Sequence, residues 1–153
     1  MILVIGIGNP ARGDDAAGLV VARHIREAAP GHVTVTELAG DQLALLDAWT
    51  GAREVYLIDA VCSGGTPGTV YRFDAAEPLT ARFWHRGTHT FSLADVIELG
   101  RALSRLPGRL TGYGIEGGTF EPGAPLSAEV EAAVQAVTAA LLRELRESSS
   151  RAG

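Results

Sequence analysis

The stretch that decides the fold is residues 2–15, ILVIGIGNPARGDD. Its apolar first part, 2–7, predicts a buried β-strand, and the glycine-rich segment after it is typical of a tight turn. Asp14 is then a natural N-cap for a helix that the pattern predicts over 14–29. In open parallel sheets, ligands bind in the crevice beyond the carboxyl ends of the strands. We therefore expect Asp15 to begin the first helix facing such a crevice.

Two other interpretations of this segment stay open at this point. Gly6, Gly8 and Ala11 fit a loose dinucleotide-binding fingerprint, although the carboxylates that follow would put acid where a pyrophosphate should lie. Alternatively, Asp14 and Asp15 only cap the helix and interact with its dipole. That second interpretation suits Asp14 better than Asp15.

The rest of the chain alternates between strand and helix patterns. The predicted strands are 2–7, 33–38, 54–60, 69–74 and 109–116, and the predicted helices are 14–29, 41–49, 92–105 and 127–147. This alternation predicts an α/β three-layer sandwich, a twisted and mostly parallel five-stranded sheet with helices on both faces. The strand 69–74 follows a short glycine turn and is expected to pair antiparallel or at an edge.

Length and composition leave room for one compact domain. The chain has 153 residues, of which 46% are hydrophobic, enough to bury a core. We expect a single α/β domain over 1–147 and a disordered tail over 148–153. Since no apolar run approaches about 18 residues, we expect no membrane span, no signal peptide and a cytoplasmic location. The single cysteine, Cys62, is expected to be a small buried hydrophobe.

Charge excludes several partners and chemistries. A net charge of -5 argues against a surface that grips nucleic acid, which normally needs a clustered basic face. All thirteen basic residues are arginine. The chain therefore has no lysine for a Schiff base, for a Walker-type phosphate loop or for a lysine general base.

Two further polar residues stand where strands are predicted to end. Asp59 closes a strand that is apolar on both faces, and a buried carboxylate needs a hydrogen-bond partner, a cation or a metal. The structural alternative is that Asp59 caps a turn into 61–65. His89 lies in the loop before a helix that Ser92 is expected to cap, and His85 is its competitor. A loop histidine alone is more often a solvent-exposed residue than a ligand.

Together, Asp15, Asp59 and His89 come from three connections that a doubly wound sheet can bring to one place. Two carboxylates and an imidazole leave coordination positions open and suit a borderline divalent ion such as nickel, manganese, iron or zinc. The sequence therefore predicts a metal site with room for a substrate.

The chain resembles a known family, the hydrogenase maturation proteases. The resemblance rests on the order and spacing of motifs at 6–10 with 13–15, 57–60, 88–89 with 92–93, 114–116 and 126–127. It spans nearly the whole chain. It implies a phosphorylase/hydrolase-like α/β fold and an endopeptidase that removes the C-terminal extension of the large-subunit precursor of nickel-iron hydrogenase after nickel insertion.

The resemblance also implies site residues. Asp15, Asp59 and His89 would be the metal-binding and catalytic residues, and the metal would be the nickel carried by the substrate. We therefore expect no tightly bound cofactor, although other divalent ions can occupy the site. The candidate substrate-binding residues are Asn9, Gly40 and Asp41. The loop 38–42 departs from the glycine-rich loop of many members, so it leaves the substrate subgroup open.

Two alternatives from other functional classes are kept. One is a metal-sensing or chaperone-like binding module that uses the same three ligands without cleaving anything. The other is an esterase similar to bacterial peptidyl-tRNA hydrolase, whose opening motif resembles 6–10. The early catalytic histidine of that esterase is missing here, and an acidic, lysine-free chain is a poor tRNA binder.

Overall fold

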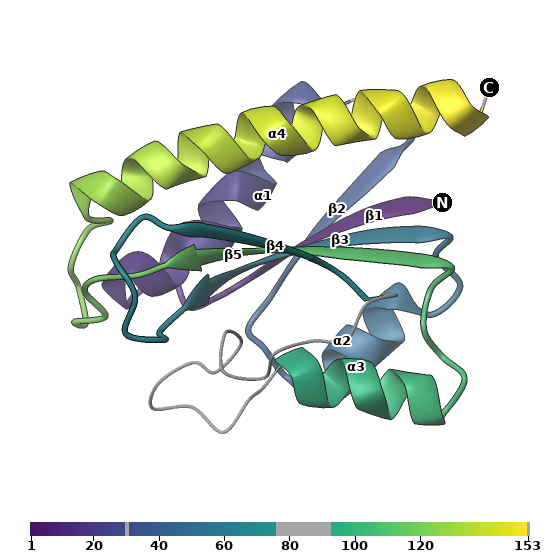
Figure 1. Ribbon diagram of the computed structural model, residues 1–153, viewed down its shortest axis with the longest axis horizontal. Coiled ribbons are helices and arrows are strands. Elements are labelled where there is room, and N and C mark those ends of the chain that lie inside the picture. The colour runs from purple at the N-terminus through teal and green to yellow at the C-terminus, as the bar shows by residue number, and fades with distance from the viewer. Residues whose placement is uncertain (30, 76–92, 153) are drawn as a thin grey trace.

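The computed structural model describes residues 1–29, 31–75 and 93–152 (Figure 1). Its strands are β1 (Ile2–Ile7), β2 (Val33–Leu38), β3 (Glu54–Val61), β4 (Val70–Asp74) and β5 (Arg109–Glu116). They form a five-stranded sheet in the order β2-β1-β3-β5-β4. All neighbours are parallel except β4, which pairs antiparallel with β5 at one edge. The predicted sheet, including its antiparallel edge strand, is confirmed.

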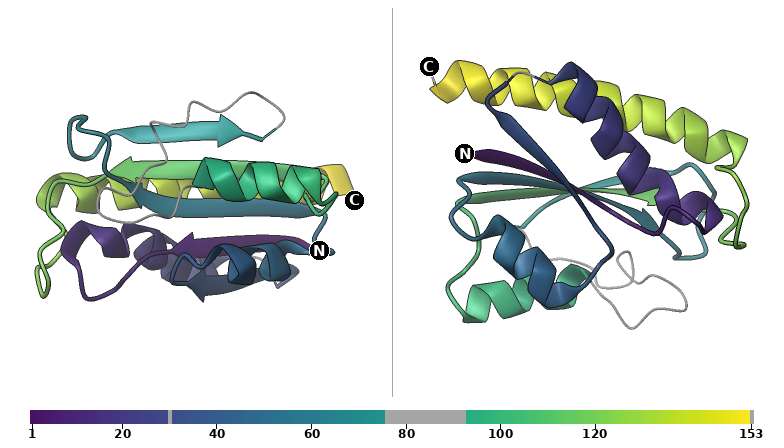
Figure 2. Two further views of the ribbon diagram at one scale, coloured as in Figure 1. Left: turned by 90° about the horizontal axis from the view of Figure 1, so that it is seen from below. Right: turned by 180° about the vertical axis from the view of Figure 1, so that it is seen from behind.

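Helices cover both faces of this sheet, as predicted. They are α1 (Ala17–Ala28), α2 (Gln42–Trp49), α3 (Leu93–Ala102) and α4 (Ala128–Ala152), and a short 3₁₀ helix, η1 (Gly13–Ala16), precedes α1. In Figures 1 and 2, α1 and α4 lie on one face and α2 and α3 on the other. One apolar cluster joins β3 to α1 and α4 through residues such as Ile58 and Leu141. A second joins β3 to α2 and α3 through residues such as Leu57 and Leu46.

Helix α1 lies unusually close to the sheet because position 18 is glycine. A Cβ added at Gly18 would lie 2.3 Å from the carbonyl oxygen of Ile58 and 2.6 Å from that of Ile7. Both distances are far shorter than a carbon–oxygen van der Waals contact, so a larger residue would push the helix away. The start of α1 is thereby seated over β1 and β3, and η1 is brought to the carboxyl ends of these strands.

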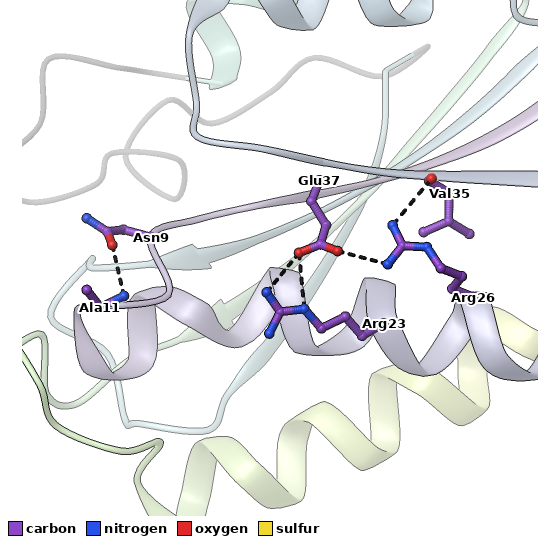
Figure 3. Close-up of polar contacts among 6 residues, drawn as sticks. All are labelled: Asn9, Ala11, Arg23, Arg26, Val35 and Glu37. Atoms are coloured by element: carbon purple, nitrogen blue, oxygen red, sulfur yellow. Dashed lines mark hydrogen bonds and ion pairs between the residues drawn. The ribbon is translucent and has the colours of Figure 1, made fainter.

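The other end of α1 is tied to the edge strand β2 by an ion-pair cluster (Figure 3). Arg26 Nη1 lies 2.9 Å from Glu37 Oε2, and Arg23 Nη2 lies 3.0 Å from Glu37 Oε1. The hydrogen bond from Arg26, supported by Arg23, lowers the pKa of Glu37 although partial burial opposes the shift. Both arginines are about half exposed, so this cluster is open to water and to salt.

The structure corrects the start of the first predicted helix. The segment from 14 onward is not one α-helix, because η1 comes first and α1 begins at Ala17. Asp14 is therefore not the N-cap of its own helix: the N-cap positions of η1 and α1 are Arg12 and Ala16, and neither makes a side-chain capping bond. The Asp14 carboxylate instead binds groups more than 100 positions later in the chain, which no local sequence pattern predicts.

Helix α4 runs to Ala152, past the predicted end at 147 and through most of the segment expected to be a disordered tail. The physical reason is visible at Ser148, which is buried and whose hydroxyl donates a hydrogen bond to Glu54. Ser148 follows Leu141 and Leu145 at helical spacing on the buried face. Within the described ranges, no helix is both long and apolar enough to cross a membrane.

Candidate active site

Asp59 lies near the carboxyl end of β3, the central strand of the sheet, with 2% of its surface exposed. Side chains alternate between the two faces of a strand. Leu57 and Val61 belong to the apolar cluster shared with α2 and α3, so Asp59 points to that face. The carboxylate thus lies near the end of a strand whose neighbours, β1 and β5, both run parallel to it.

Asp15 lies in η1, just beyond the carboxyl end of β1, with 3% of its surface exposed. Its backbone is packed against the turn that leaves β1: a Cβ added at Gly8 would lie 2.1 Å from the Asp15 carbonyl oxygen. Three residues later, Gly18 rests on the carbonyl oxygen of Ile58, the residue before Asp59. The two carboxylates predicted as ligands are therefore buried on adjoining segments, as the doubly wound topology requires.

Asp14 joins η1 to the connection between β5 and α4. Its carboxylate accepts hydrogen bonds from the backbone nitrogens of Gly118 (2.8 Å), Thr119 (3.0 Å) and Ser127 (2.7 Å), and from the Ser127 hydroxyl (2.9 Å). Burial alone would raise the pKa of Asp14, but these four hydrogen bonds outweigh it and lower the pKa. The prediction that Asp14 caps its own helix is therefore wrong, and Asp14 instead binds Ser127, the residue just before α4.

Glu116 ends β5 and is 1% exposed. Its Oε2 accepts from the backbone nitrogen of Ser63 at 2.9 Å, and its Oε1 accepts from the Tyr71 hydroxyl at 3.0 Å and from the Ser63 hydroxyl. The turn after β3 is thus held by Glu116 from the neighbouring strand. Sequence reasoning noted Glu116 only within a motif and assigned it no role, although an acid closing an apolar strand is the same signal that singled out Asp59.

The three candidate substrate-binding residues lie in the connections that follow β1 and β2. Asn9 Oδ1 accepts a hydrogen bond from the Ala11 nitrogen at 2.9 Å (Figure 3). Asp41 Oδ1 caps α2 by accepting from the nitrogens of Leu43 (2.9 Å) and Ala44 (3.5 Å), and Gly40 has a positive φ of 102°. The turn after β1 is bonded to the end of β2, since Gly8 donates to Leu38. A role in substrate binding stays a prediction for all three.

The third predicted ligand, His89, lies outside the described residues, as do His85 and Ser92. In the part of the chain that the structure describes, no three acidic, histidine or cysteine side chains are grouped to hold a metal ion. The structure therefore places Asp15 and Asp59 on adjoining buried segments at the carboxyl edge of the sheet, and their joint role as ligands stays a prediction. Cys62 was expected to be buried but is exposed, because the turn after β3 begins there and leaves the sheet.

Comparison with known proteins gives a consistent result. The family model HycI, described as hydrogenase maturation protease, matches residues 20–144. A hydrogenase 2 maturation protease of Escherichia coli (strain K12) is 30% identical over 155 residues, covering 99% of this chain and 94% of that protein. The hydrogenase expression/formation protein HupD of Rhodobacter capsulatus is 29% identical over 95% of this chain and 71% of that protein.

Solved structures agree with the sequence comparisons. The solution structure of an endopeptidase from Escherichia coli superposes with a TM-score of 0.80 at 27% identity, covering 96% of this chain and 93% of that one. The hydrogenase maturating endopeptidase HybD from Escherichia coli superposes with a TM-score of 0.74 at 26% identity and the same coverage.

Proposed function

Because this chain belongs to the hydrogenase maturation protease family and is an endopeptidase of that family, we propose that it removes the C-terminal extension of a nickel-iron hydrogenase large-subunit precursor after nickel insertion. The observation that carries the proposal is the pair of buried carboxylates, Asp15 and Asp59, on adjoining segments at the carboxyl edge of the sheet. Burying two carboxylates together is costly, and a divalent cation relieves that cost.

The nickel in this proposal is part of the substrate. Asp15 and Asp59 would supply oxygen ligands, and His89 would supply an imidazole nitrogen, a donor set that suits borderline divalent ions. Since three ligands leave the coordination incomplete, the isolated protein holds no ion tightly. A precursor without nickel would lack the atom that joins it to the site, so it would not be positioned for cleavage.

The hydrolytic step needs a base and a polarised carbonyl. Asp15 or Asp59 takes a proton from a water molecule oriented at the ion, and the hydroxide adds to the carbonyl carbon of the scissile peptide bond. The carbon–nitrogen bond then breaks as the same proton passes to the leaving nitrogen. The products are a new C-terminal carboxylate on the large subunit and a released peptide with a free amine.

The substrate's backbone would lie along the connections after β1 and β2, where Asn9, Gly40 and Asp41 are the proposed contacts. The partner would be a protein, and we propose that the reaction takes place in the cytoplasm. The family is one of proteases, so neither the binding-module alternative nor the esterase alternative gains support from it.

The test is cleavage of nickel-loaded and nickel-free large-subunit precursor, read by intact mass, with the unaltered protein and with Asp15→Asn, Asp59→Asn and His89→Ala. We expect loss of a C-terminal peptide only from the loaded precursor and only with the unaltered protein. Binding without cleavage by the unaltered protein would favour the metal-sensing module. Equal cleavage by all four proteins would remove the three residues from the mechanism.

A further inference from the structure

Glu116 lies on the same face of the sheet as Asp59, one strand away. In the parallel pair of β3 and β5, Asp59 is opposite Gly114, and Val61 is opposite Glu116. Because residues two apart on a strand share a face, Asp59, Val61 and Glu116 all point toward the side of α2 and α3. One strand spacing and two residue rises put the Cα atoms of Asp59 and Glu116 about 8 Å apart.

Within the described ranges, Glu116 accepts its hydrogen bonds from neutral groups. Its two oxygens accept from the Ser63 nitrogen, the Ser63 hydroxyl and the Tyr71 hydroxyl. Among the described residues no arginine forms an ion pair with Glu116, in contrast to Glu37, Glu54 and Glu144. The bonds hold the carboxylate in place and occupy both of its oxygens, and no cationic side chain of the described residues cancels its negative charge.

We propose that Glu116 is a positioning residue for the cation: its fixed negative charge favours a divalent ion between Asp15 and Asp59 without coordinating it, and its bonds to Ser63 hold the turn that follows Asp59. The inference rests on the proposed function, because it concerns the same ion. A charge in a water-poor environment acts on an ion several ångströms away with little screening, so a buried anion beside the site strengthens cation binding.

The chemistry of the donors lets the charge be removed while the hydrogen bonds are kept. In Glu116→Gln, the amide oxygen can accept from the Ser63 nitrogen, and the amide nitrogen can donate to the two hydroxyl oxygens, which accept as readily as they donate. Asp14 offers no such test. Three of its four donors are backbone N–H groups that cannot reverse, so a side-chain amide there would set donor against donor.

Ser63→Ala is the matched control. It removes one hydroxyl donor to Glu116 while leaving the charge and the bond from the Ser63 nitrogen in place. The two variants therefore separate charge from bonding: Glu116→Gln loses only the charge, and Ser63→Ala loses only a hydrogen bond.

The experiment is a titration of the isolated protein with Ni²⁺, followed by paramagnetic broadening of the backbone amide NMR signals near Asp59, such as those of Ala60 and Gly114. We expect Glu116→Gln to raise the half-saturating nickel concentration about tenfold. The reason is the loss of one partly screened negative charge, on a residue whose Cα atom lies about 8 Å from that of Asp59. Ser63→Ala should change it less than about twofold, and Asp59→Asn should abolish the local broadening.

The outcomes distinguish this inference from the function on which it rests. Equal nickel affinity in Glu116→Gln and the unaltered protein, with binding lost in Asp59→Asn, would overturn the role of Glu116 alone. Broadening that survives Asp59→Asn, or that never develops in the unaltered protein, would overturn the cation site and the inference with it. If Glu116→Gln folds poorly, Glu116→Met, of similar length and also neutral, is titrated below its melting temperature with the same expectation.

Discussion

The buried acids at the carboxyl edge of the sheet and the partly exposed acids Glu37 and Glu144 are stabilised in different ways. At the edge, Asp14 and Glu116 accept hydrogen bonds from backbone nitrogens and hydroxyls. By contrast, Glu37, near the end of the outer strand β2, binds two arginines, and Glu144 on α4 binds Arg72. An arginine cancels the charge of its partner, whereas neutral donors hold a carboxylate and leave its charge available. Among the described residues, Asp14 and Glu116 thus form no ion pair with an arginine near the place where a cation is proposed to bind.

The largest effect is expected where neutral donors would lose a shared acceptor. Asp14→Ala leaves three backbone N–H groups without their partner. Each such group costs about 1–3 kcal/mol when it is fully buried. Since Thr119 and Ser127 are partly buried and Gly118 is exposed, we expect the free energy of unfolding to fall by about 3 kcal/mol. Chemical denaturation measures it.

Glu121→Ala is the control for this variant, since Glu121 is exposed in the same connection between β5 and α4 and should change the free energy of unfolding by less than about 0.5 kcal/mol. A loss below about 1 kcal/mol in Asp14→Ala would mean that water replaces the carboxylate, and the contrast between the two regions would be weaker than the structure indicates.

A smaller effect is expected at Glu144, which lies on α4 and is half-buried. Its Oε1 lies 2.5 Å from Arg72 Nη2, and it accepts a hydrogen bond from the Tyr113 hydroxyl. Glu144→Gln should lower the free energy of unfolding at pH 7 by about 1.5 kcal/mol, because a hydrogen bond to a charged group is replaced by a neutral one. Glu147→Gln, on the exposed side of the same helix, is the control and should be nearly neutral.

The pH dependence of that loss follows from the pKa of Glu144. Burial alone would raise this pKa, but the hydrogen bonds from Arg72 and Tyr113 outweigh it and the pKa is lowered. Since the folded-state pKa lies below the unfolded value of about 4.3, the stabilisation is present above that pH and disappears as the pH falls through the folded-state pKa. The deficit of Glu144→Gln should therefore shrink in acid. A deficit that is constant from pH 7 to about pH 2 would contradict this assignment.

The smallest effect is expected at the exposed cluster of Glu37 with Arg23 and Arg26. Glu37→Gln should cost about 0.5–1 kcal/mol at low ionic strength, and most of that loss should vanish in about 1 M NaCl, because exposed ion pairs are screened. The loss in Asp14→Ala should not shrink in salt. If both variants respond alike to salt, the distinction between neutral donors and arginine partners fails.

Sequence patterns were sufficient for the sheet because each strand carries its own signal. The limits of β1, β2 and β5 agree with the prediction to the residue. Strand β1 is a buried apolar run, whereas β2 is an edge strand in which valine and threonine alternate, and a glycine turn follows each. The same logic placed Asp15 and Asp59 at the carboxyl edge. Helix ends were less predictable, because the end of α4 depends on the bond from Ser148 to Glu54, far away in sequence.

The roles of Asp14 and Glu116 could not be predicted for the same reason. A helix N-cap is a local pattern, and Asp14 satisfies it, yet its donors lie at 118, 119 and 127. The donors to Glu116 lie at 63 and 71. Only the folded topology brings these groups together. The hydrogen-bond partners of Asp14 and Glu116 are therefore a property of the tertiary structure and not of a local pattern. The contribution of His89 stays a prediction from the sequence.

The hydrogen bonds of Asp14 also bear on the order in which parts of this protein fold. They join η1 to groups 104 to 113 positions later in the chain, and such long loops close late in folding. While the chain is being synthesised, β1, α1 and β3 can pack before the connection to α4 exists, but η1 then lacks the bonds that Asp14 makes to that connection. A nascent chain therefore lacks part of what holds η1 at the carboxyl edge until residues 118–127 have been synthesised.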